Sequence, residues 1–479
     1  MQKIFANPSN LEKLAKENYA VPQFLMMENA ARGLAEFILD FSPENVLILC
    51  GKGNNGGDGY AAARLLQDKC KVTVVSIEPP AAEEAKAQYE MCKRLDINLI
   101  PSLDAGTSKP HVILDCIYGT GFHGELPENI KALLDTVNNS SAIKIACDIP
   151  SGLYFHADYT ITMGCQKLAL YSDKAKEVCG KIIVQDLGLS RDKFENPEHA
   201  VVEPAETTFL VDSSDITLPF RKKRAAHKGT YGHTAVYSGD KGGACILAAT
   251  AAMKFGSGLT TIINQPSSEL SQFKISPELM ISDKLPKKTT CIIAGPGFTQ
   301  FSETASNQIQ EWFKSQNNPA AVFDAGFITS QELPALLKEL NECNSARIVL
   351  TPHLSEFSTL LKNLTGEDCT VSELAENPQK KIELGKIINE KYPQTALVIK
   401  SSNTFIACGG ETFIIANGAQ NLAKGGSGDI LAGLIAALLA QGYSAKDAAI
   451  TAAFHHAETA RTLGEECYNL TPELLLEHI

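Results

Sequence analysis

The sequence has no long uncharged apolar run, no Cys-x-x-Cys pair and no excess of positive charge. Each apolar run is too short, or too often interrupted by charged residues and glycine, to cross a membrane. We therefore expect no transmembrane span. The first residues, Met-Gln-Lys-Ile-Phe-Ala-Asn-Pro, lack the apolar segment of a secretory signal, so we expect a cytoplasmic protein. The hydrophobic content of 44% and charged content of 20% are typical of a soluble globular protein.

The thirteen cysteines are scattered singly along the chain, and their number is odd. This pattern indicates reduced thiols in the core and argues against a disulfide framework or a zinc site. The net charge of −12 disfavours binding to nucleic acid or to an anionic membrane through bulk electrostatics. A phosphate-bearing small molecule, held by local amides and a few cations, is the partner that the composition favours.

At 479 residues the chain exceeds what one core usually covers, so we expect two domains, residues 1–210 and 211–479. In the first, β-branched runs alternate with helix-like segments. Strands that lack polar alternation and are separated by helices indicate a parallel sheet covered on both faces, here a Rossmann-like three-layer α/β domain. The predicted strands are Val46–Cys50, Val72–Ile77, Val112–Cys116, Ile143–Cys147 and Lys181–Gln185.

A polar, basic connector is predicted over residues 205–225, and its Arg221–Arg224 run is read more readily as a solvated linker than as an anion site. Beyond it the alternation resumes, which predicts a second α/β domain. Two further runs joined across Gly409-Gly410 predict an antiparallel hairpin at one edge. The predicted strands are His233–Ser238, Leu259–Asn264, Cys291–Ala294, Ala321–Asp324, Arg347–Leu350, Ala396–Lys400, Thr404–Cys408 and Glu411–Ala416.

In the first domain, polar residues gather where predicted strands end. A glycine-rich loop, Gly51–Gly59, joins the first strand to a helix predicted over Tyr60–Gln67, and Asp115 and Asp148 end two later strands. The glycines of the Gly51–Gly59 loop do not have the spacing of the dinucleotide fingerprint Gly-x-Gly-x-x-Gly, so no ordinary NAD site is predicted. Carboxylate and amide oxygens suit a hard cation, while a carboxylate that is not bound to it can act as a base. Each aspartate could alternatively only cap a turn.

At these positions the chain closely resembles the NAD(P)H-hydrate epimerase family over most of residues 1–210, through Met27-Glu-Asn-Ala30, the loop just described, Gly119-Thr-Gly121 after Asp115, and Asp148-Ile-Pro-Ser-Gly152. The resemblance implies that Asn55, Asp115 and Ser151 hold a potassium ion and that Asp148 transfers a proton during inversion at C6. The residues implied to line the hydrated nucleotide are Asn54, Asn55, Gly56, Gly57, Asp58, Gly119, Thr120, Gly121, Phe122, His123, Gly124, Glu125 and Asp148.

In the second domain, three glycines and Asp429 precede an apolar run that ends at Ala440. A glycine-rich turn that presents free N–H groups at the start of a long helix makes an anion site. Asp429 would then face the anion as a base. The alternative is a tight turn followed by an acidic residue that only caps the helix.

Other motifs of the second domain also fall at predicted strand ends, where α/β domains bind ligands. They are Lys228–Gly232, Ser238–Ala244, Gly295–Gly297, Asp324–Gly326, Thr351–Phe357 and Lys400–Thr404. His353 is as consistent with a hydrogen-bonded loop histidine as with a functional one. Lys400 could be an edge lysine whose amine reaches solvent.

Together these motifs resemble the ADP-dependent NAD(P)H-hydrate dehydratase family, which has a ribokinase-like fold, over roughly residues 215–479. Ser355 and Ser401 stand where that family usually has glycine. The resemblance implies that Ala244, Gly297, His353 and Asp429 face the hydrate, that Asp429 is catalytic, and that Mg²⁺ accompanies ADP. The residues implied to bind the nucleotide are Lys400, Ser401, Ser402, Asn403, Thr404, Ala419, Lys424, Gly425, Gly426, Ser427 and Gly428.

The sequence therefore predicts a bifunctional enzyme of metabolite repair that acts on hydrated NADH and NADPH, with ADP as co-substrate and potassium in the first domain. We expect a homo-oligomer without nucleic-acid or membrane partners. Two alternatives stay open. The second domain could be a small-molecule kinase, since a base beside a glycine-rich turn would equally activate an alcohol. The first could be a binding module that has lost catalysis.

Overall fold

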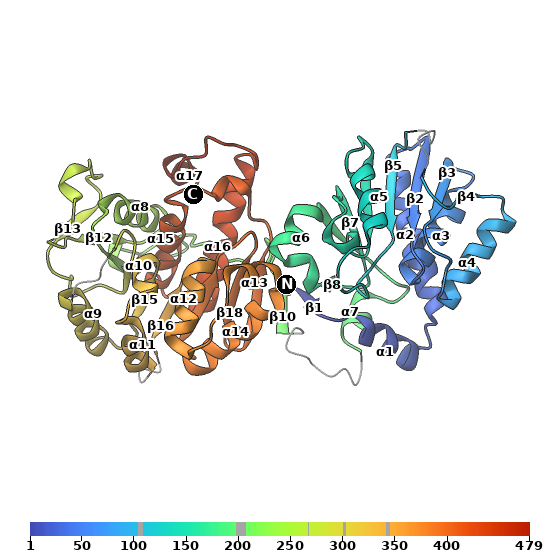
Figure 1. Cartoon of the computed structure of the whole chain (residues 1–479). Helices are drawn as coiled ribbons and strands as arrows, with labels where there is room; N and C mark the ends of the chain where they lie inside the picture. The colour runs from blue at the N-terminus through green and yellow to red at the C-terminus, as the bar shows by residue number, and fades with distance from the viewer. Residues whose placement is uncertain (104–108, 198–206, 267, 300–302, 342–344) are drawn as a thin grey trace. The chain divides into compact units, whose positions relative to one another are not determined.

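The computed structural model describes residues 1–103, 109–197, 207–266, 268–299, 303–341 and 345–479 (Figure 1). Its contacts divide the chain into two compact units, Lys3–Glu206 and Thr207–Ile479 together with Met1–Gln2. The division falls four residues before the domain boundary that we expected after residue 210. The first two residues of the predicted linker, 205 and 206, lie outside the described residues.

The N-terminal unit is built on a seven-stranded sheet in the order β4-β3-β2-β5-β6-β7-β9, and every pairing in it is parallel. This is the strand order of a doubly wound Rossmann sheet, in which the order reverses beside β2. Its strands are β2 (Asn45–Cys50), β3 (Lys71–Ser76), β4 (Asn98–Ile100), β5 (Val112–Cys116), β6 (Ile143–Cys147), β7 (Tyr159–Met163) and β9 (Lys181–Gln185). Two short strands outside this sheet, β1 (Gln2–Phe5) and β8 (Gln166–Lys167), pair in parallel.

Helices cover both faces of this sheet, as its strands, which are apolar on both sides over most of their length, require. Val46 and Ile48 of β2 lie in one core cluster and Leu47 and Leu49 in the other. The first cluster includes residues of α2 and α3, and the second includes residues of α5. The helices of this unit are α1 (Ser9–Tyr19), α2 (Gln23–Leu39), α3 (Asn54–Leu66), α4 (Glu83–Arg94), α5 (Glu128–Asn138), α6 (Asp173–Val178) and α7 (Arg191–Glu195).

The helix after β2 begins earlier than predicted. We expected it to start at Tyr60, but α3 starts at Asn54, inside the glycine-rich segment. These glycines leave no room for a side chain. A Cβ atom added to Gly56 would lie 2.0 Å from the Gly51 carbonyl oxygen, and one added to Gly57 would lie 2.5 Å from the Met27 methyl carbon. These glycines are therefore helical residues that permit close packing of the first turn, and only residues 51–53 form the loop.

The C-terminal unit has a sheet in the order β13-β12-β11-β14-β15-β16-β17-β18-β19-β10. Pairings from β13 through β17 are parallel and the next two are antiparallel. Its strands are β10 (Thr208–Leu210), β11 (His233–Tyr237), β12 (Leu259–Ile263), β13 (Met280–Ser282), β14 (Cys291–Ala294), β15 (Ala320–Phe323), β16 (Arg347–Leu350), β17 (Thr395–Ile399), β18 (Thr404–Cys408) and β19 (Glu411–Ile415).

The hairpin predicted across Gly409-Gly410 is confirmed, and both glycines have positive φ, as a tight hairpin turn requires. The prediction that the hairpin forms the edge of the sheet is wrong. Strand β10 pairs in parallel with β19 and lies outside it. With three residues and no flanking apolar run, β10 gives too weak a sequence pattern to be found in advance.

Three helices, α8, α15 and α16, form the core on one face of the C-terminal sheet. Helix α15 is apolar on all sides because it is enclosed between the sheet, α8 and α16. The helices of the unit are α8 (Gly242–Lys254), α9 (Glu303–Ser315), α10 (Ala325–Ile328), α11 (Leu333–Asn341), α12 (Leu354–Thr365), α13 (Val371–Glu376), α14 (Pro378–Lys391), α15 (Ser427–Ala440), α16 (Ala445–Thr462) and α17 (Pro472–His478).

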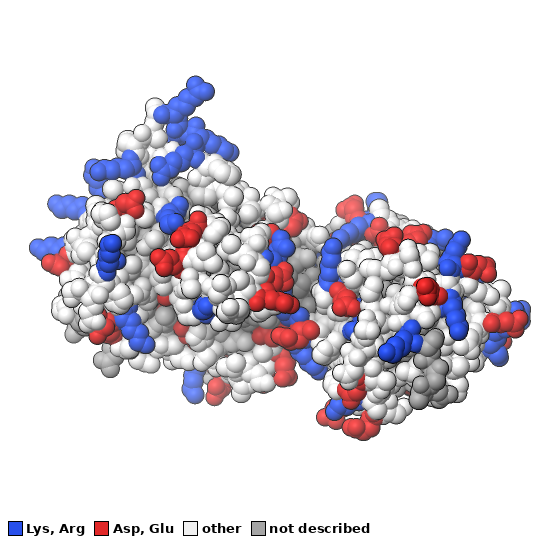
Figure 2. Space-filling view, turned by 90° about the horizontal axis from the view of Figure 1, so that it is seen from above, with Lys and Arg blue, Asp and Glu red and all other residues white. Residues whose placement is uncertain are grey.

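Among the described residues, no helix is long and apolar enough to span a bilayer. The twelve cysteines in the described part of the chain are free thiols. Lys and Arg side chains are interspersed with Asp and Glu over the visible surface of the N-terminal unit, at the right of Figure 2. Because positive and negative side chains alternate on this surface, an anion would be bound by individual side chains and backbone amides and not by a large positive patch.

Candidate active sites

The N-terminal unit contains a cavity of about 770 Å³ at the carboxyl ends of β2, β5 and β6. Nine of the predicted ligand-contacting residues line it: Asn54, Asn55, Asp58, Gly119, Thr120, Gly121, Phe122, Glu125 and Asp148. Four others, Gly56, Gly57, His123 and Gly124, are not among its described lining residues. Further lining residues come from α1 and α2, which no strand-end pattern could indicate: Glu12, Gln23, Met26, Met27 and Ala30.

Asp148 follows β6 with a φ of 70°, a left-handed conformation that aspartate tolerates better than most residues. Its carboxylate oxygen Oδ1 lies 2.5 Å from Lys167 Nζ. The N–H of Thr120 donates to Oδ2 at 3.2 Å, and that of Met163 donates to Oδ1 at 3.3 Å. An ion pair and two amide donors therefore hold a charged carboxylate at the cavity wall.

Lys167 is the residue that the sequence analysis missed at this site. Its side chain is 2% exposed, and its amine also donates to Thr162 Oγ1 at 2.9 Å and to the Met163 carbonyl at 2.7 Å. Burial opposes the charge on Lys167, but the Asp148 carboxylate and its neighbours raise the pKa of Lys167 above the ordinary value. The amine is therefore cationic. The available signal was a lysine directly before a short apolar run, Leu168–Tyr171.

Two further carboxyls act on the same lysine. Burial raises the pKa of Glu12, and burial with the charges of Asp148 and Glu12 raises the pKa of Asp58 well above its ordinary value. One buried cation cannot balance three buried anions, so Asp148, which pairs with Lys167 directly, is the carboxylate that the geometry keeps charged. Asp58, whose closest described donor is the Cys147 thiol at 3.9 Å, is favoured in its neutral form.

Asp115 and Ser151, predicted potassium ligands, lie in contact. The carboxylate of Asp115 accepts from the Ser151 hydroxyl at 2.7 Å, from the Ser151 N–H at 2.8 Å and from the Ile117 N–H at 3.1 Å. It is fully buried, and burial raises the pKa of Asp115 to about 6.

The third predicted ligand, Asn55, lies nearby. The side chains of Asn55 and Asp148 both lie against Gly119, since a Cβ atom added to Gly119 would be 3.5 Å from Asn55 Oδ1 and 2.9 Å from Asp148 Oδ2. The Asn55 side-chain nitrogen is buried without a hydrogen-bond partner. The carboxylate of Asp115, which has no described basic neighbour, the Ser151 hydroxyl and the Asn55 amide oxygen are the kinds of oxygen ligand that a monovalent cation takes.

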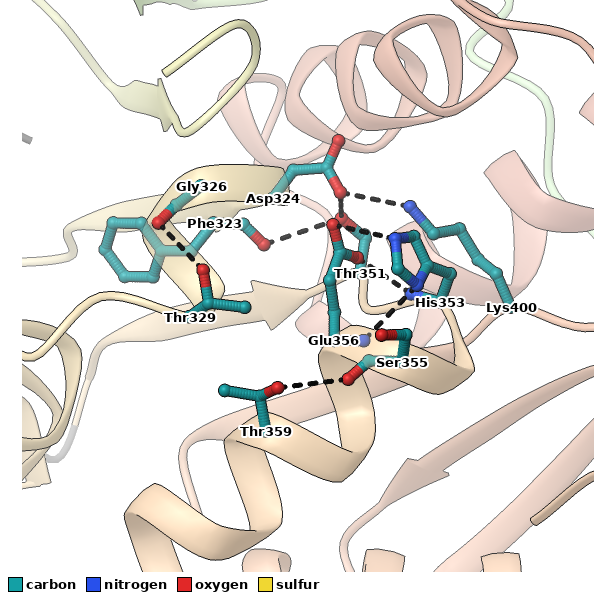
Figure 3. Close-up of polar contacts among 10 residues, drawn as sticks. All are labelled: Phe323, Asp324, Gly326, Thr329, Thr351, His353, Ser355, Glu356, Thr359 and Lys400. Carbon is teal, nitrogen blue, oxygen red and sulfur yellow. Dashed lines mark hydrogen bonds and ion pairs between the residues drawn. The ribbon is translucent and has the colours of Figure 1, made fainter. Parts of the chain in front are cut away.

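In the C-terminal unit, three strand ends meet at Asp324 (Figure 3). Its oxygen Oδ1 lies 3.0 Å from Lys400 Nζ and accepts from the Thr351 hydroxyl at 2.7 Å. The Asp324 side chain is 3% exposed, while that of Lys400 is 21% exposed. The ion pair therefore fixes the lysine at the base of the site and leaves part of it accessible. Asp324 was noted only as the start of a strand-end motif, without a role.

His353 and Glu356 form a reciprocal cap at the start of α12 (Figure 3). The Glu356 N–H donates to His353 Nδ1 at 3.2 Å, and the His353 N–H donates to the Glu356 carboxylate at 2.9 Å. The histidine side chain is 57% exposed. His353 is thus a capping residue, and its exposed ring can still face a ligand.

Asp429 lies in the first turn of α15, whose N-cap, Gly426, has a φ of 97° and makes no side-chain cap. An added Cβ at Gly428 would lie 3.3 Å from Lys400 Nζ, so the lysine amine reaches this turn. Burial, with the charges of Asp324 and Glu356, raises the pKa of Asp429 to about 7, against the opposing effect of Lys400. A carboxyl that titrates near neutral pH is suited to accept a proton there.

A buried histidine lies behind the same turn. His456 Nε2 is 3.4 Å from the Ser427 hydroxyl, and burial lowers the pKa of His456 to about 4. The ring is therefore neutral. It was not predicted from the sequence, because it lies in the middle of α16 without a motif around it.

The structure gives contacts for several other predicted residues of this unit. Gly297 lies beside Ala244, since an added Cβ at Gly297 would be 3.2 Å from the Ala244 Cβ. The loop after β17 lies beside the segment before α15, since an added Cβ at Gly418 would be 3.3 Å from the Ser402 carbonyl oxygen. Lys424 differs from the rest because its amine donates to the Tyr468 carbonyl at 3.1 Å. Nucleotide binding by these residues stays a prediction.

Comparison with known proteins finds relatives of both units. Residues 236–479 match the family described as NAD(P)H-hydrate dehydratase, and residues 24–169 match the YjeF-related protein N-terminus. The chain is similar to the bifunctional NAD(P)H-hydrate repair enzyme Nnr of Helicobacter pylori, at 35% identity over 100% of this chain and 99% of that protein. The same enzyme of Coxiella burnetii is 32% identical over 95% and 93% of the two chains.

Among solved structures, the chain is similar to the ADP/ATP-dependent NAD(P)H-hydrate dehydratase of Bacillus subtilis co-crystallized with ATP/Mg²⁺. The two are 26% identical, with a TM-score of 0.43 over 54% of this chain and 90% of that one. The predicted fold class, an α/β chain with a Rossmann-like unit followed by a ribokinase-like unit, is confirmed.

Proposed function

Since the chain belongs to the family of bifunctional NAD(P)H-hydrate repair enzymes, we propose that its N-terminal unit interconverts the R and S epimers of hydrated NADH and NADPH and that its C-terminal unit dehydrates the S epimer at the expense of ADP. The observation that carries the proposal is that each unit places a carboxylate near a lysine at its candidate site. Asp148 forms an ion pair with Lys167, and Asp429 lies within the influence of Lys400, which is itself paired with Asp324.

In the N-terminal unit, Asp148 transfers the proton that inversion at C6 of the hydrated ring requires. Its ion pair with Lys167 favours the ionised form, which can accept a proton. The amide donors of Thr120 and Met163 hold the carboxylate in one orientation. Asp58, kept neutral by burial, is placed to supply a proton in the same cavity.

We propose that Asn55, Asp115 and Ser151 hold a potassium ion. The cation would balance the buried charge of Asp115 and order the adjoining segment, in which the Tyr118 N–H donates to the Ser151 hydroxyl at 2.9 Å. Asp115 would then be a structural ligand, while Asp148 remains the residue that moves a proton. The two carboxylates have different expected responses to potassium.

In the C-terminal unit, we propose that Lys400–Thr404, Ala419 and Lys424–Gly428 bind ADP. Asp429 takes the proton of the C6 hydroxyl while that oxygen forms a bond to the terminal phosphorus of ADP and the bond from phosphorus to the nucleotide breaks. The amides at the start of α15 stabilise the charge on the transferred group. Loss of phosphate from C6, together with a proton from C5, then forms the C5–C6 double bond and restores the dihydronicotinamide ring.

Mg²⁺ is expected to accompany ADP in this site. Among the described residues, no group of three or more acidic, histidine or cysteine side chains is arranged to hold a metal ion, so the ion would be bound mainly by the phosphates of ADP and by water, with at most one or two carboxylates. We further propose a cytoplasmic homo-oligomer whose partners are small molecules.

The test is incubation of the purified chain with a chemically prepared R/S mixture of NADPH hydrate, with ADP or ATP, following the absorbance of the restored dihydronicotinamide. Complete conversion of the mixture supports both activities. Conversion of only the S portion leaves the N-terminal unit as a binding module. A phosphorylated product without restored cofactor favours the kinase alternative.

A further inference from the structure

The cavity of the N-terminal unit is strongly acidic. Five carboxyls line it: Glu12, Asp58, Glu78, Glu125 and Asp148. Among the described lining residues, Lys52 is the only one with a cationic side chain. The substrate of the proposed epimerase is a dinucleotide, whose diphosphate carries negative charge. Binding such a substrate in this cavity requires a local cation to offset the carboxyls.

Lys52 and Glu78 form an ion pair in the lining of the cavity. Lys52 Nζ is 3.0 Å from Glu78 Oε2, and the two side chains are 58% and 40% exposed. Both charges act on the Tyr118 hydroxyl, so these three lining residues form one group. Asp148, Asp58 and Glu12 act on one another and on the buried Lys167, and they form a second group.

The position of the pair in the sheet is that of a nucleotide-binding point. Lys52 immediately precedes the N-cap of α3, at the first crossover of the sheet, and Glu78 follows the adjacent strand β3. In doubly wound sheets the diphosphate binds at the start of this helix, and an acidic residue about 20 positions later, after the next strand, binds a ribose hydroxyl. Glu78 lies 24 positions after Asn54, the first residue of α3.

We propose that Lys52 binds a phosphate group of the hydrated dinucleotide and that Glu78 holds the lysine in place and contacts the neighbouring ribose. This inference rests on the proposed epimerase activity. It orients the substrate in the cavity, with the hydrated ring beside Asp148 and the phosphate end beside Lys52. The phosphate is either the diphosphate, which both substrates have, or the 2′-phosphate, which only NADPH hydrate has.

The test measures the KM and kcat of epimerisation for NADH hydrate and NADPH hydrate with Lys52→Gln. We expect KM to rise about tenfold with kcat nearly unchanged, because the contact is remote from C6. A rise for both substrates assigns the diphosphate, and a rise for NADPH hydrate alone assigns the 2′-phosphate. An unchanged KM for both, in a chain whose wild type epimerises, would overturn the inference.

The matched control is Lys93→Gln, which breaks an equally short exposed ion pair, Lys93–Glu90 at 3.0 Å, on α4 and outside the cavity lining. It should leave both KM values unchanged. Glu78→Gln should improve the ratio of kcat/KM for NADPH hydrate to that for NADH hydrate, since it removes an anion that repels the 2′-phosphate. A wild type without epimerase activity would refute the proposed function, an outcome distinct from unchanged KM values in the variants.

Discussion

Asp148 and Asp429 are the proposed proton-transfer carboxylates of the two units, but they differ in position and in their relation to a lysine. Asp148 directly follows β6, whereas Asp429 lies in the first turn of α15. Asp148 pairs directly with the buried Lys167 at 2.5 Å. The lysine that acts on Asp429, Lys400, is itself paired with Asp324. Burial and nearby carboxyls then raise the pKa of Asp429 to about 7.

This difference shows that two aspartates can differ as bases, because the neighbouring charges and the burial of each carboxylate determine how readily it binds a proton. Asp148 has the buried Lys167 as its own ion-pair partner, whereas Asp429 shares Lys400 with Asp324, and the pKa of Asp429 is raised to about 7. The first is suited to repeated proton exchange at one carbon. The second is suited to take up a proton once in each phosphoryl transfer.

The largest expected effect is that of Asp429→Asn. An amide cannot accept the C6 hydroxyl proton, so ADP-dependent dehydration of the S hydrate should fall about 10²–10⁴-fold. Epimerisation by the same variant should be unchanged, because Asp148 belongs to the other unit. Near-normal dehydration would remove Asp429 from the mechanism.

Asp148→Asn should reduce the interconversion of R and S hydrates by a similar or smaller factor, about 10²–10⁴-fold, because its amide has no proton-accepting carboxylate. Dehydration of pure S hydrate is the internal control and should be unaffected. Normal epimerisation by this variant would show that Lys167 and Asp148 form a purely structural pair.

Asp115→Ala should act through potassium. The loss of one ligand is expected to raise the half-saturating potassium concentration by about tenfold, so added potassium should partly restore epimerisation. The defect of Asp148→Asn should not respond. Potassium titrations of both variants check this distinction, and identical responses would mean that the two carboxylates do not have separate roles.

The pH dependence gives a smaller effect on the intact enzyme. A raised pKa means that Asp429 is protonated below about pH 7 and ionised above it. The kcat/KM of dehydration should therefore rise about tenfold between pH 6 and pH 8. Epimerisation, followed over the same range, should lack that step. A flat dehydration profile would mean that Asp429 is not the base.

Much of this arrangement could be predicted from local sequence. Short runs rich in apolar and β-branched residues predicted β2, β3, β5, β6 and β9. A polar residue at the end of such a run lies at a carboxyl edge whatever the rest of the chain does. This is why Asp115 and Asp148 could be identified. Asp429 could be identified because a glycine-rich turn and an apolar helix follow each other directly.

What could not be predicted depends on contacts between distant segments. Lys167 meets Asp148 through the short strand β8, and Glu12 reaches the same cavity from α1. Asp324 and Lys400 are 76 positions apart and meet only because β15 and β17 both flank β16. The start of α3 was misplaced because its glycines were taken as loop residues, whereas close packing is what requires them.

The central claim is that two independent carboxylates, in two units of one chain, act in sequence through a substrate that leaves one site and enters the other. Mixing equal amounts of the Asp148→Asn and Asp429→Asn variants tests it directly. With an R/S mixture of NADPH hydrate and ADP, each variant supplies the activity that the other lacks, so the mixture should restore rapid, complete conversion to NADPH. If the mixed variants convert no more than Asp148→Asn alone, the two carboxylates do not serve separate, sequential reactions.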